Sequence, residues 1–337
     1  MVSPVGYTAQ QTCAALRAGI VRFCELPDVV SGDGGPTITA RIPPGFAPAN
    51  RPAERLRQIA QHTLRQALAP RDPTGTSRPL GLSVVLRDGE TLSSESFLAL
   101  QSVLSDIGRS APTRMHVYPQ GSAGGMIAVR DAQERLADDP RAIELVWGID
   151  SLHDIPTLLR LEQSARLKGR SQPRGLIPGE ASACVALEDL RCAQTEGSNV
   201  YCTVAGLGIA KEPAPVLSEL PCLGKGLTDC IRDALRMARW SQMDIGQVYC
   251  DLNGEAYRAH EWMLARCRTL DSPEVLHCAD CIGDIGAASM PLLLGVAAIA
   301  WARGYARSER CLVFCSSEQG TRGALCVQNA CRDSRSR

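Results

Sequence analysis

Two patterns of apolar and polar residues alternate along the chain. In some segments the apolar residues recur at helical spacing, which predicts helices, and in others a short apolar run predicts a buried strand. The predicted helices are 8–18, 54–69, 93–107, 155–167, 227–239, 256–267 and 290–302, and a Pro/Gly-rich stretch, 31–52, is predicted to be a surface excursion. The predicted strands are 80–86, 142–147, 179–187, 201–207 and 247–251. This alternation indicates an α/β fold with a mainly parallel sheet.

Residues 116–136, HVYPQGSAGGMIAVRDAQERL, are predicted to form an elbow between a strand and a helix. Small residues fill the turn, so the chain can reverse tightly and display one residue at the helix N-terminus. There the backbone N–H groups and the helix dipole favour an anion. The elbow contains no cysteine and no histidine at its turn, and the residues that it can display are Gly121 and Ser122.

A second segment has the same layout further along the chain. HVYPQGSAGGM, a helix and AIELVWGIDS align with CIGDIGAASMPLLLGVAAIAWA and ERCLVFCSSEQG. Each copy places a small-residue elbow that ends in Met before a helix and a strand. Self-similarity over this length predicts an internally duplicated fold, with an N-terminal half of residues 1–190 and a C-terminal half of residues 191–331.

Composition narrows the classes of protein that fit this pattern. The 337 residues are 45% hydrophobic and 21% charged, so the chain can bury a large core and is not expected to be disordered. Lys plus Arg and Asp plus Glu number 36 each, so the broad positive surface of a nucleic-acid binder is not expected. The longest apolar run, 290–302, is too short for a membrane span, and the sequence shows no secretion signal. We therefore expect a cytoplasmic protein without a membrane or nucleic-acid partner.

Fifteen cysteines could suggest a disulfide scaffold, but their number is odd, their spacing is irregular and most lie in apolar runs. Buried thiols are the favoured interpretation. Cys278 and Cys281 form a CxxC beside His277, which raises a zinc site or a redox pair as alternatives. No second CxxC and no spaced pair of histidines follows them, so neither a metal nor a cofactor is predicted.

Motifs spread over nearly the whole chain resemble those of one superfamily. They are MVSPVGYTAQQTCAALRAGI, VWGIDSL, IPGEASACVALED, GDIGAASMPLLLGVAAIAWARG and SSEQGTRGALCV. Together they resemble the thiolase superfamily and, within it, the 3-oxoacyl-ACP synthases, or ketosynthases. The resemblance implies a thiolase-like fold of two duplicated α/β halves in a layered α-β-α-β-α architecture. It also implies a cysteine on the first elbow that attacks an acyl thioester, assisted by two basic or amide residues from the second half.

The nucleophile position implied by the resemblance falls at Gly121 or, one residue on, at Ser122. No cysteine lies between Cys24 and Cys184, so no shift of the alignment restores one. Ser122 could act as a nucleophile, but the surrounding sequence is not the Gly-x-Ser-x-Gly of hydrolase elbows, and a serine needs a base within hydrogen-bond reach. A role for Ser122 as the N-cap of the following helix is therefore favoured.

The two assisting positions are altered as well. The first falls at Asp251, Leu252 or Asn253, and the second falls at Asp284. An ionised carboxylate at Asp284 would repel a thioester oxyanion, whereas an amide or imidazole stabilises it. With all three positions changed, the sequence indicates a ketosynthase-like pseudoenzyme that acts as a binding, scaffolding or accessory protein.

Asp251, Asn253, Glu255 and Arg258 directly follow a predicted buried strand, where ligands bind in open α/β folds. They could face the pocket, or they could form a turn in which Glu255 caps the next helix. Asp284 could join this cluster or cap the helix after it. The alternative function is therefore an active acyltransferase or thioester hydrolase of altered mechanism, acting on acyl-CoA or acyl-ACP through Ser122 or these carboxylates.

Partners are implied by the resemblance and by one basic loop. Degenerate ketosynthase-like proteins with a DLNGE segment resemble those encoded beside type VI secretion spike and effector-adaptor genes, which implies a secretion adaptor or effector as partner. The loop 166–174 is basic and could meet an acidic acyl carrier protein or a phosphate, although a solvated loop is favoured.

The resemblance also bears on assembly and on the start of the chain. The family forms homodimers through edge strands near the elbow, so residues 116–119 are expected at or near such an edge. The family enters its SPxG turn from a strand in the centre of the sheet, and here Met1 stands where that strand would end. We expect a reading frame that begins too late rather than a sheet that lacks a strand, because loss of a central strand exposes a row of backbone groups.

Overall fold

The computed structural model describes residues 1–30, 34–43, 45–46, 52–68, 78–90, 102 and 114–330. Its helices are α1 (Ala9–Arg17), α2 (Pro52–Leu68), α4 (Gly121–Asp138), α5 (Ile155–Gln163), α6 (Leu190–Thr195), α7 (Lys225–Ala238), α8 (Ala256–Thr269), α9 (Ala279–Ile282) and α10 (Ser289–Ala302), with short 3-10 turns η1 (Gln242–Asp244) and η2 (Gly286–Ala288). Its strands are β1 (Cys24–Val30), β2 (Pro36–Thr39), β3 (Leu80–Val85), β4 (Arg114–Tyr118), β5 (Ile143–Ser151), β6 (Glu180–Leu187), β7 (Cys202–Lys211), β8 (Gln247–Cys250), β9 (Glu274–His277), β10 (Arg310–Ser316) and β11 (Thr321–Asn329).

Two large sheets repeat one strand order. The first runs β4-β3-β5-β6 and the second β9-β8-β10-β11, with β7 added beside β11. In each sheet the first three strands are parallel and the fourth is antiparallel to its neighbour. The sheets are therefore mixed, because one strand of each repeat, and β7 in the second sheet, breaks the parallel pattern that the sequence predicts.

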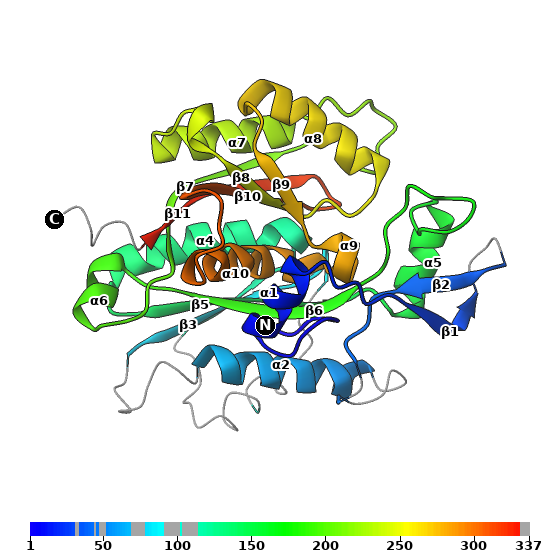
Figure 1. The fold of residues 1–337 in the computed structure, drawn as a ribbon, viewed down its shortest axis with the longest axis horizontal. Helices are drawn as coiled ribbons and strands as arrows, with labels where there is room; N and C mark the ends of the chain where they lie inside the picture. Colours follow the sequence, from blue (N-terminus) through cyan, green and yellow to red (C-terminus); the bar gives the residue numbers. More distant parts are fainter. Residues whose placement is uncertain are drawn as a thin grey trace.

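The layers alternate between helices and sheets, as Figure 1 shows from bottom to top. Helix α2 covers the outer face of the first sheet, α4 and α10 lie between the two sheets, and α7 and α8 cover the outer face of the second. This is the α-β-α-β-α architecture expected of a thiolase-like fold. The main core lies in the middle layer, where Met126 of α4 and Met290 of α10 are fully buried.

The sequence of helix α10 explains how the middle layer packs between the two sheets. Its sequence, SMPLLLGVAAIAWA, is apolar nearly all round, which is typical of a helix buried between two surfaces. Gly125 of α4 makes the close helix crossing possible, since a Cβ there would lie 2.6 Å from Cε of Met290. Both elbow helices are thus held in fixed positions relative to both sheets, and their N-termini face the same region.

Several boundaries differ from the predicted ones. Part of the expected surface excursion, 31–52, belongs to β2, which begins at Pro36 and pairs with β1 in a hairpin. The predicted helix 93–107 lies outside the described residues apart from residue 102. The expected strand before the SPxG turn is not central: Val2 pairs with Ser182 on the outer side of β6, which ends the strand order of the first sheet. The prediction of a central position was therefore wrong.

Candidate functional site

The elbow between β4 and α4 is formed as the sequence predicts. Gly121 has a φ of +56°, a backbone conformation that glycine adopts without strain, and its N–H donates to the carbonyl of Leu86. Ser317 fastens the turn from the second half, because its Oγ accepts from the N–H of Ala123 at 2.9 Å and donates to the carbonyl of Gln120. The elbow therefore displays Gly121, a residue without a side chain.

Ser122 does not have the N-cap role that the sequence favours. The helix begins one residue earlier, with Gln120 as its N-cap, so Ser122 is the second residue of α4. Its Oγ points instead toward the second elbow and donates to the carbonyl of Gly286 at 3.0 Å. The side chain is buried, and this hydrogen bond joins it to a backbone acceptor rather than to a base.

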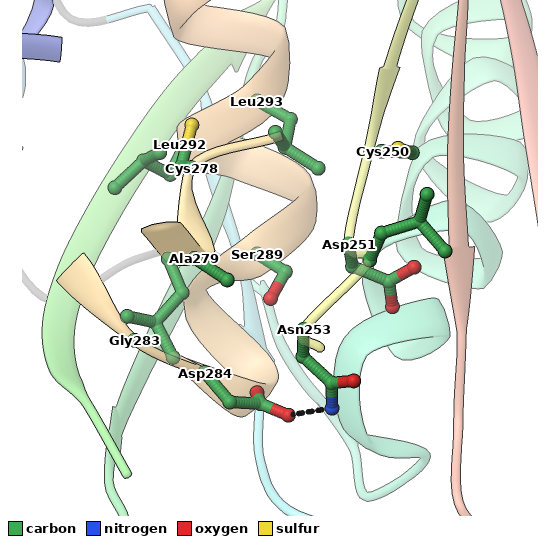
Figure 2. A pocket seen from close by; sticks show the side chains of 12 residues that line it. Cys250, Asp251, Asn253, Cys278, Ala279, Gly283, Asp284, Ser289, Leu292 and Leu293 are labelled. Atoms are coloured by element: carbon green, nitrogen blue, oxygen red, sulfur yellow. Dashed lines mark hydrogen bonds between the residues drawn. The ribbon is translucent and has the colours of Figure 1, made fainter. Parts of the chain in front are cut away.

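Asn253 connects the other candidate residues. Its Nδ2 donates to Oε2 of Glu255 at 2.8 Å and to Oδ2 of Asp284 at 2.7 Å, and Figure 2 shows the second of these bonds across the gap between β8 and α10. Asp284 also accepts from the N–H of Gly286 at 2.9 Å. Asp284 thus joins the cluster and stabilises the turn before α10. It does not cap the following helix, because the N-cap of η2 is Ile285 and that of α10 is Ala288. Glu255 occupies the N-cap position of α8 but makes no side-chain capping bond.

Arg166 belongs to the cluster as well, although the sequence pattern does not predict it there. Its guanidinium holds Glu255 with two bonds, Nε to Oε1 at 2.6 Å and Nη2 to Oε2 at 3.0 Å, and it binds Glu318 at 2.6 Å. A solvated loop was favoured for 166–174, and for Arg166 this is wrong because the side chain is buried. The signal available was the apolar Leu167, which pairs with Leu176 and draws the start of the loop into the core.

Asp251 belongs to a second part of the same network. Its Oδ2 accepts from Nη1 of Arg258 at 3.0 Å and from the N–H of Ser316 at 2.8 Å, and Arg258 also donates to the carbonyl of Ser316. The other oxygen of Asp251, Oδ1, is buried and has no hydrogen-bond partner among the described residues. Asp251 therefore positions the end of β10 through Arg258 and is not free to act on a ligand through Oδ2.

The electrostatics of the network follow from burial and pairing. Burial raises the pKa of Asp251 and of Asp284, and the charge of Arg258 opposes this shift only in part. Burial would also raise the pKa of Glu255, but the hydrogen bonds and the charge of Arg166 outweigh it and lower that pKa. Glu255 is therefore held as a carboxylate by its arginine, which is the condition of a structural ion pair.

The space beside these residues is small. A cavity of about 20 Å³ separates β8 from the start of α10, and Figure 2 shows the side chains around it. Its lining is formed by Cys250, Asp251, Leu252, Asn253, Cys278, Ala279, Gly283, Asp284, Ile285, Ser289, Leu292 and Leu293. A cavity of this size holds about one water molecule, whereas ligand pockets usually measure about 300–1,000 Å³. The cluster therefore fills the position where the sequence predicted a pocket.

Two further groups of potential metal ligands lie outside this cluster. Burial raises the pKa of Cys278 and raises that of Cys281 to about 11, so both thiols stay protonated near neutral pH. Donor atoms of Glu212, Cys222 and Glu261 lie within 4.8 Å of one another. Glu212 already accepts from two backbone N–H groups, and Glu261 pairs with a buried arginine at 2.8 Å. Both carboxylates are therefore engaged in structural contacts.

Comparisons with known proteins agree with this geometry. No family model matches the chain. A curated relative, 3-oxoacyl-[acyl-carrier-protein] synthase 2 of Coxiella burnetii, is 26% identical over 121 residues, which cover 35% of this chain and 29% of the length of that relative. Among the described residues, no helix is long and apolar enough to cross a bilayer.

Solved structures match along almost the whole chain. The ishigamide ketosynthase/chain length factor superposes with a TM-score of 0.79 at 17% identity, covering 97% of this chain and 96% of its own. A β-ketoacyl synthase from Burkholderia phymatum gives 0.77 at 16% identity, covering 98% and 97%. A type II polyketide ketosynthase in complex with its acyl-carrier protein gives 0.77 at 15% identity, with the same coverage. The chain therefore has the thiolase-like fold of the ketosynthases.

Proposed function

We propose that this chain is a ketosynthase-like pseudoenzyme that acts as a binding or accessory protein. The observation that carries the proposal is the elbow, where the fold of a condensing enzyme displays Gly121 and offers no thiol. Carbon–carbon condensation in such a fold begins with transfer of an acyl group to a nucleophile. A glycine cannot accept that group, so the chain cannot perform the first step in the usual way.

The residues of the second half support the same proposal. Asn253 and Asp284 bind each other, and Glu255 is held by Arg166, so each of these side chains is bound to another residue of the chain. The catalytic alternative has less support, because Oγ of Ser122 donates to a carbonyl and Asp251 is fixed by Arg258. A general base has to reach the proton that it abstracts, and the hydrogen bond that Ser122 Oγ donates goes to the carbonyl of Gly286 and not to a carboxylate.

The test is incubation with panels of acyl-CoA and acyl-ACP thioesters, followed by intact-mass and peptide-mapped mass spectrometry. We expect no acyl adduct at the elbow and no thioester hydrolysis above the rate with heat-denatured protein. The exposed thiols Cys24 and Cys267 are monitored separately because they can be acylated without catalysis. An adduct or turnover that the Ser122→Ala substitution abolishes would refute the pseudoenzyme and establish the acyltransferase or hydrolase.

For the binding role we propose a protein partner, namely an adaptor or effector of a type VI secretion system, as the DLNGE resemblance implies. An acyl carrier protein is the second candidate, supported by the ketosynthase whose solved complex contains one. The gene neighbourhood separates the two at little cost. Titration of the purified chain with each candidate by calorimetry then measures the affinity, and micromolar or tighter binding to the adaptor with none to the carrier is expected.

We also propose a homodimer formed through β4. This strand ends the order of the first sheet, so residues 116–118 lie at a sheet edge as predicted, and Val117 is 37% exposed there. An edge strand with unpaired backbone groups and an exposed apolar side chain can pair with the same strand of a second copy. Solution scattering that gives the mass of a single chain would contradict this proposal.

A further inference from the structure

A carboxylate from the first half, that of Asp88, lies against the elbow. Asp88 belongs to the turn after β3. Its Oδ2 accepts from the N–H of Gln319 at 3.3 Å, and the backbone of Glu318 also donates to its carboxylate. The turn after β3 and the turn between β10 and β11 are therefore joined by this one side chain beside the N-terminus of α4.

The geometry at Gly121 shows what Asp88 faces. A Cβ built on Gly121 would lie 3.0 Å from Oδ2 and 3.2 Å from Cγ of Asp88, and 3.5 Å from Oγ of Ser317. Any side chain displayed by the elbow would therefore point at the carboxylate. An oxygen atom of Asp88 therefore crowds the place where a side chain of residue 121 would begin.

The position also suits a negative charge. Helix α4 is 18 residues long, and its N-terminus favours an anion, as it would favour a thiolate. The backbone N–H groups of Gln319 and Glu318 also donate to this carboxylate. The helix end and the two backbone donors favour the carboxylate form of Asp88, whereas burial raises the pKa of Asp88 and outweighs the two donors.

We infer that Asp88 is a built-in anion that replaces the missing nucleophile and closes the elbow. This inference rests on the proposed function and deepens it. It states that the elbow lacks a cysteine and that Asp88 lies where the side chain of that cysteine would act. The Cβ of a cysteine introduced at position 121 would lie 3.0 Å from Oδ2 of Asp88. Its thiolate would be repelled by the resident charge, so the cysteine alone would remain a poor nucleophile.

The experiment compares the thiol reactivity of Gly121→Cys with that of the double variants Gly121→Cys/Asp88→Asn and Gly121→Cys/Asp88→Ala. Trypsin releases residues 115–130 as one peptide, and this peptide contains no native cysteine. The fraction of this peptide alkylated by iodoacetamide over time therefore reports position 121 alone, despite the other thiols. The matched control is Gly121→Cys/Glu90→Gln, which removes an exposed acid two residues away.

The double variants at Asp88 are expected to react at least tenfold faster than Gly121→Cys at pH 7, because one unit of thiol pKa changes the thiolate fraction about tenfold. The Glu90 control is expected to react at the rate of the single variant. Equal rates for Gly121→Cys and both Asp88 double variants would overturn the inference, as would an acceleration of the same size in the control.

A second measurement avoids the cysteine, since a side chain at a φ of +56° is strained. Asp88→Ala leaves the N–H groups of Gln319 and Glu318 without their acceptor, so the melting temperature of this variant is expected to fall. It is expected to recover in tens of millimolar formate, measured against chloride at equal ionic strength. Glu90→Ala is expected to show no recovery. If formate stabilises the two variants equally, the inference fails. The wild-type chain has no thiol at position 121, so these outcomes leave the thioester test of the proposed function independent.

Discussion

Replacing Arg166 by methionine is expected to destabilise the protein strongly. Arg166 and Glu255 are each 5% exposed, and the substitution would leave the buried carboxylate with only the more distant Arg258, whose Nε lies 3.9 Å from Oε2 of Glu255. Removal of one partner of a buried pair costs about 3–5 kcal/mol, because the remaining charge keeps its desolvation penalty. The hydrogen bond from Asn253 to Glu255 remains and does not replace the charge. We therefore expect a loss of about 3–5 kcal/mol in the free energy of unfolding.

The same magnitude can be expressed as a melting temperature. An unfolding entropy of about 2.1 cal/mol/K per residue gives roughly 0.7 kcal/mol/K for a chain of this length, so the expected shift is about 4–7 °C downward. Urea unfolding followed by tryptophan fluorescence gives the free energy, and differential scanning calorimetry gives the temperature. Arg160→Met is the matched control, because Arg160 is 41% exposed and its pair with Glu318 is worth about 0–1 kcal/mol.

A double variant separates the ion pair from simple loss of packing. In Arg166→Met/Glu255→Gln no uncompensated carboxylate remains at position 255, so at least half of the lost stability should return. If Arg166→Met costs less than 1 kcal/mol, or costs no more than Arg160→Met, the description of this pair as a structural ion pair is refuted. If the double variant is no more stable than the single one, the loss comes from packing and not from charge.

Three further predictions concern other parts of the fold. Burial lowers the pKa of His153 to about 4, whereas the unfolded chain protonates near pH 6.5, so the unfolded state binds more protons between these values and stability falls as the pH is lowered through them. When the free energy of unfolding is measured with urea at a series of pH values, His153→Gln should reduce its dependence on pH in this range. An unchanged slope of free energy against pH would contradict the assignment. Gly148→Ala should cost about 1–3 kcal/mol or more, since its Cβ would lie 2.2 Å from the carbonyl oxygen of Ala287, and an unchanged melting curve would disprove that close approach. Val117→Asp should convert the proposed dimer to monomers in sedimentation, unless β4 is not the interface.

The parts of the fold that sequence patterns predict are those in which one short-range signal decides the structure. The apolar run at 142–147 fits β5, whose two faces are both buried, and the continuous apolar stretch at 290–302 fits α10 between two sheets. The hairpin of β1 and β2 escaped prediction because its strands contain prolines, which local propensity assigns to loops. Its pairing depends on register rather than on residue type.

Only part of the candidate site could be predicted from the sequence. The cluster of Asp251, Asn253 and Glu255 follows β8 directly, so its place at a strand end could be inferred from neighbours in sequence. Arg166 could not be inferred in this way, since 89 residues separate it from Glu255 and only the packed fold brings them together. Asp88 escaped for a related reason, because its contact with the elbow arises where two turns from different halves meet.

The middle layer has a consequence for how the chain folds. Helix α4 contacts strands of the second sheet, and α10 contacts β6 of the first, so each half covers its central helix with a sheet of the other. A fragment that ends after the first half would leave one face of α4 bare and apolar. Neither repeat can therefore reach its native packing alone, and the duplicated chain is expected to fold and unfold as one cooperative unit.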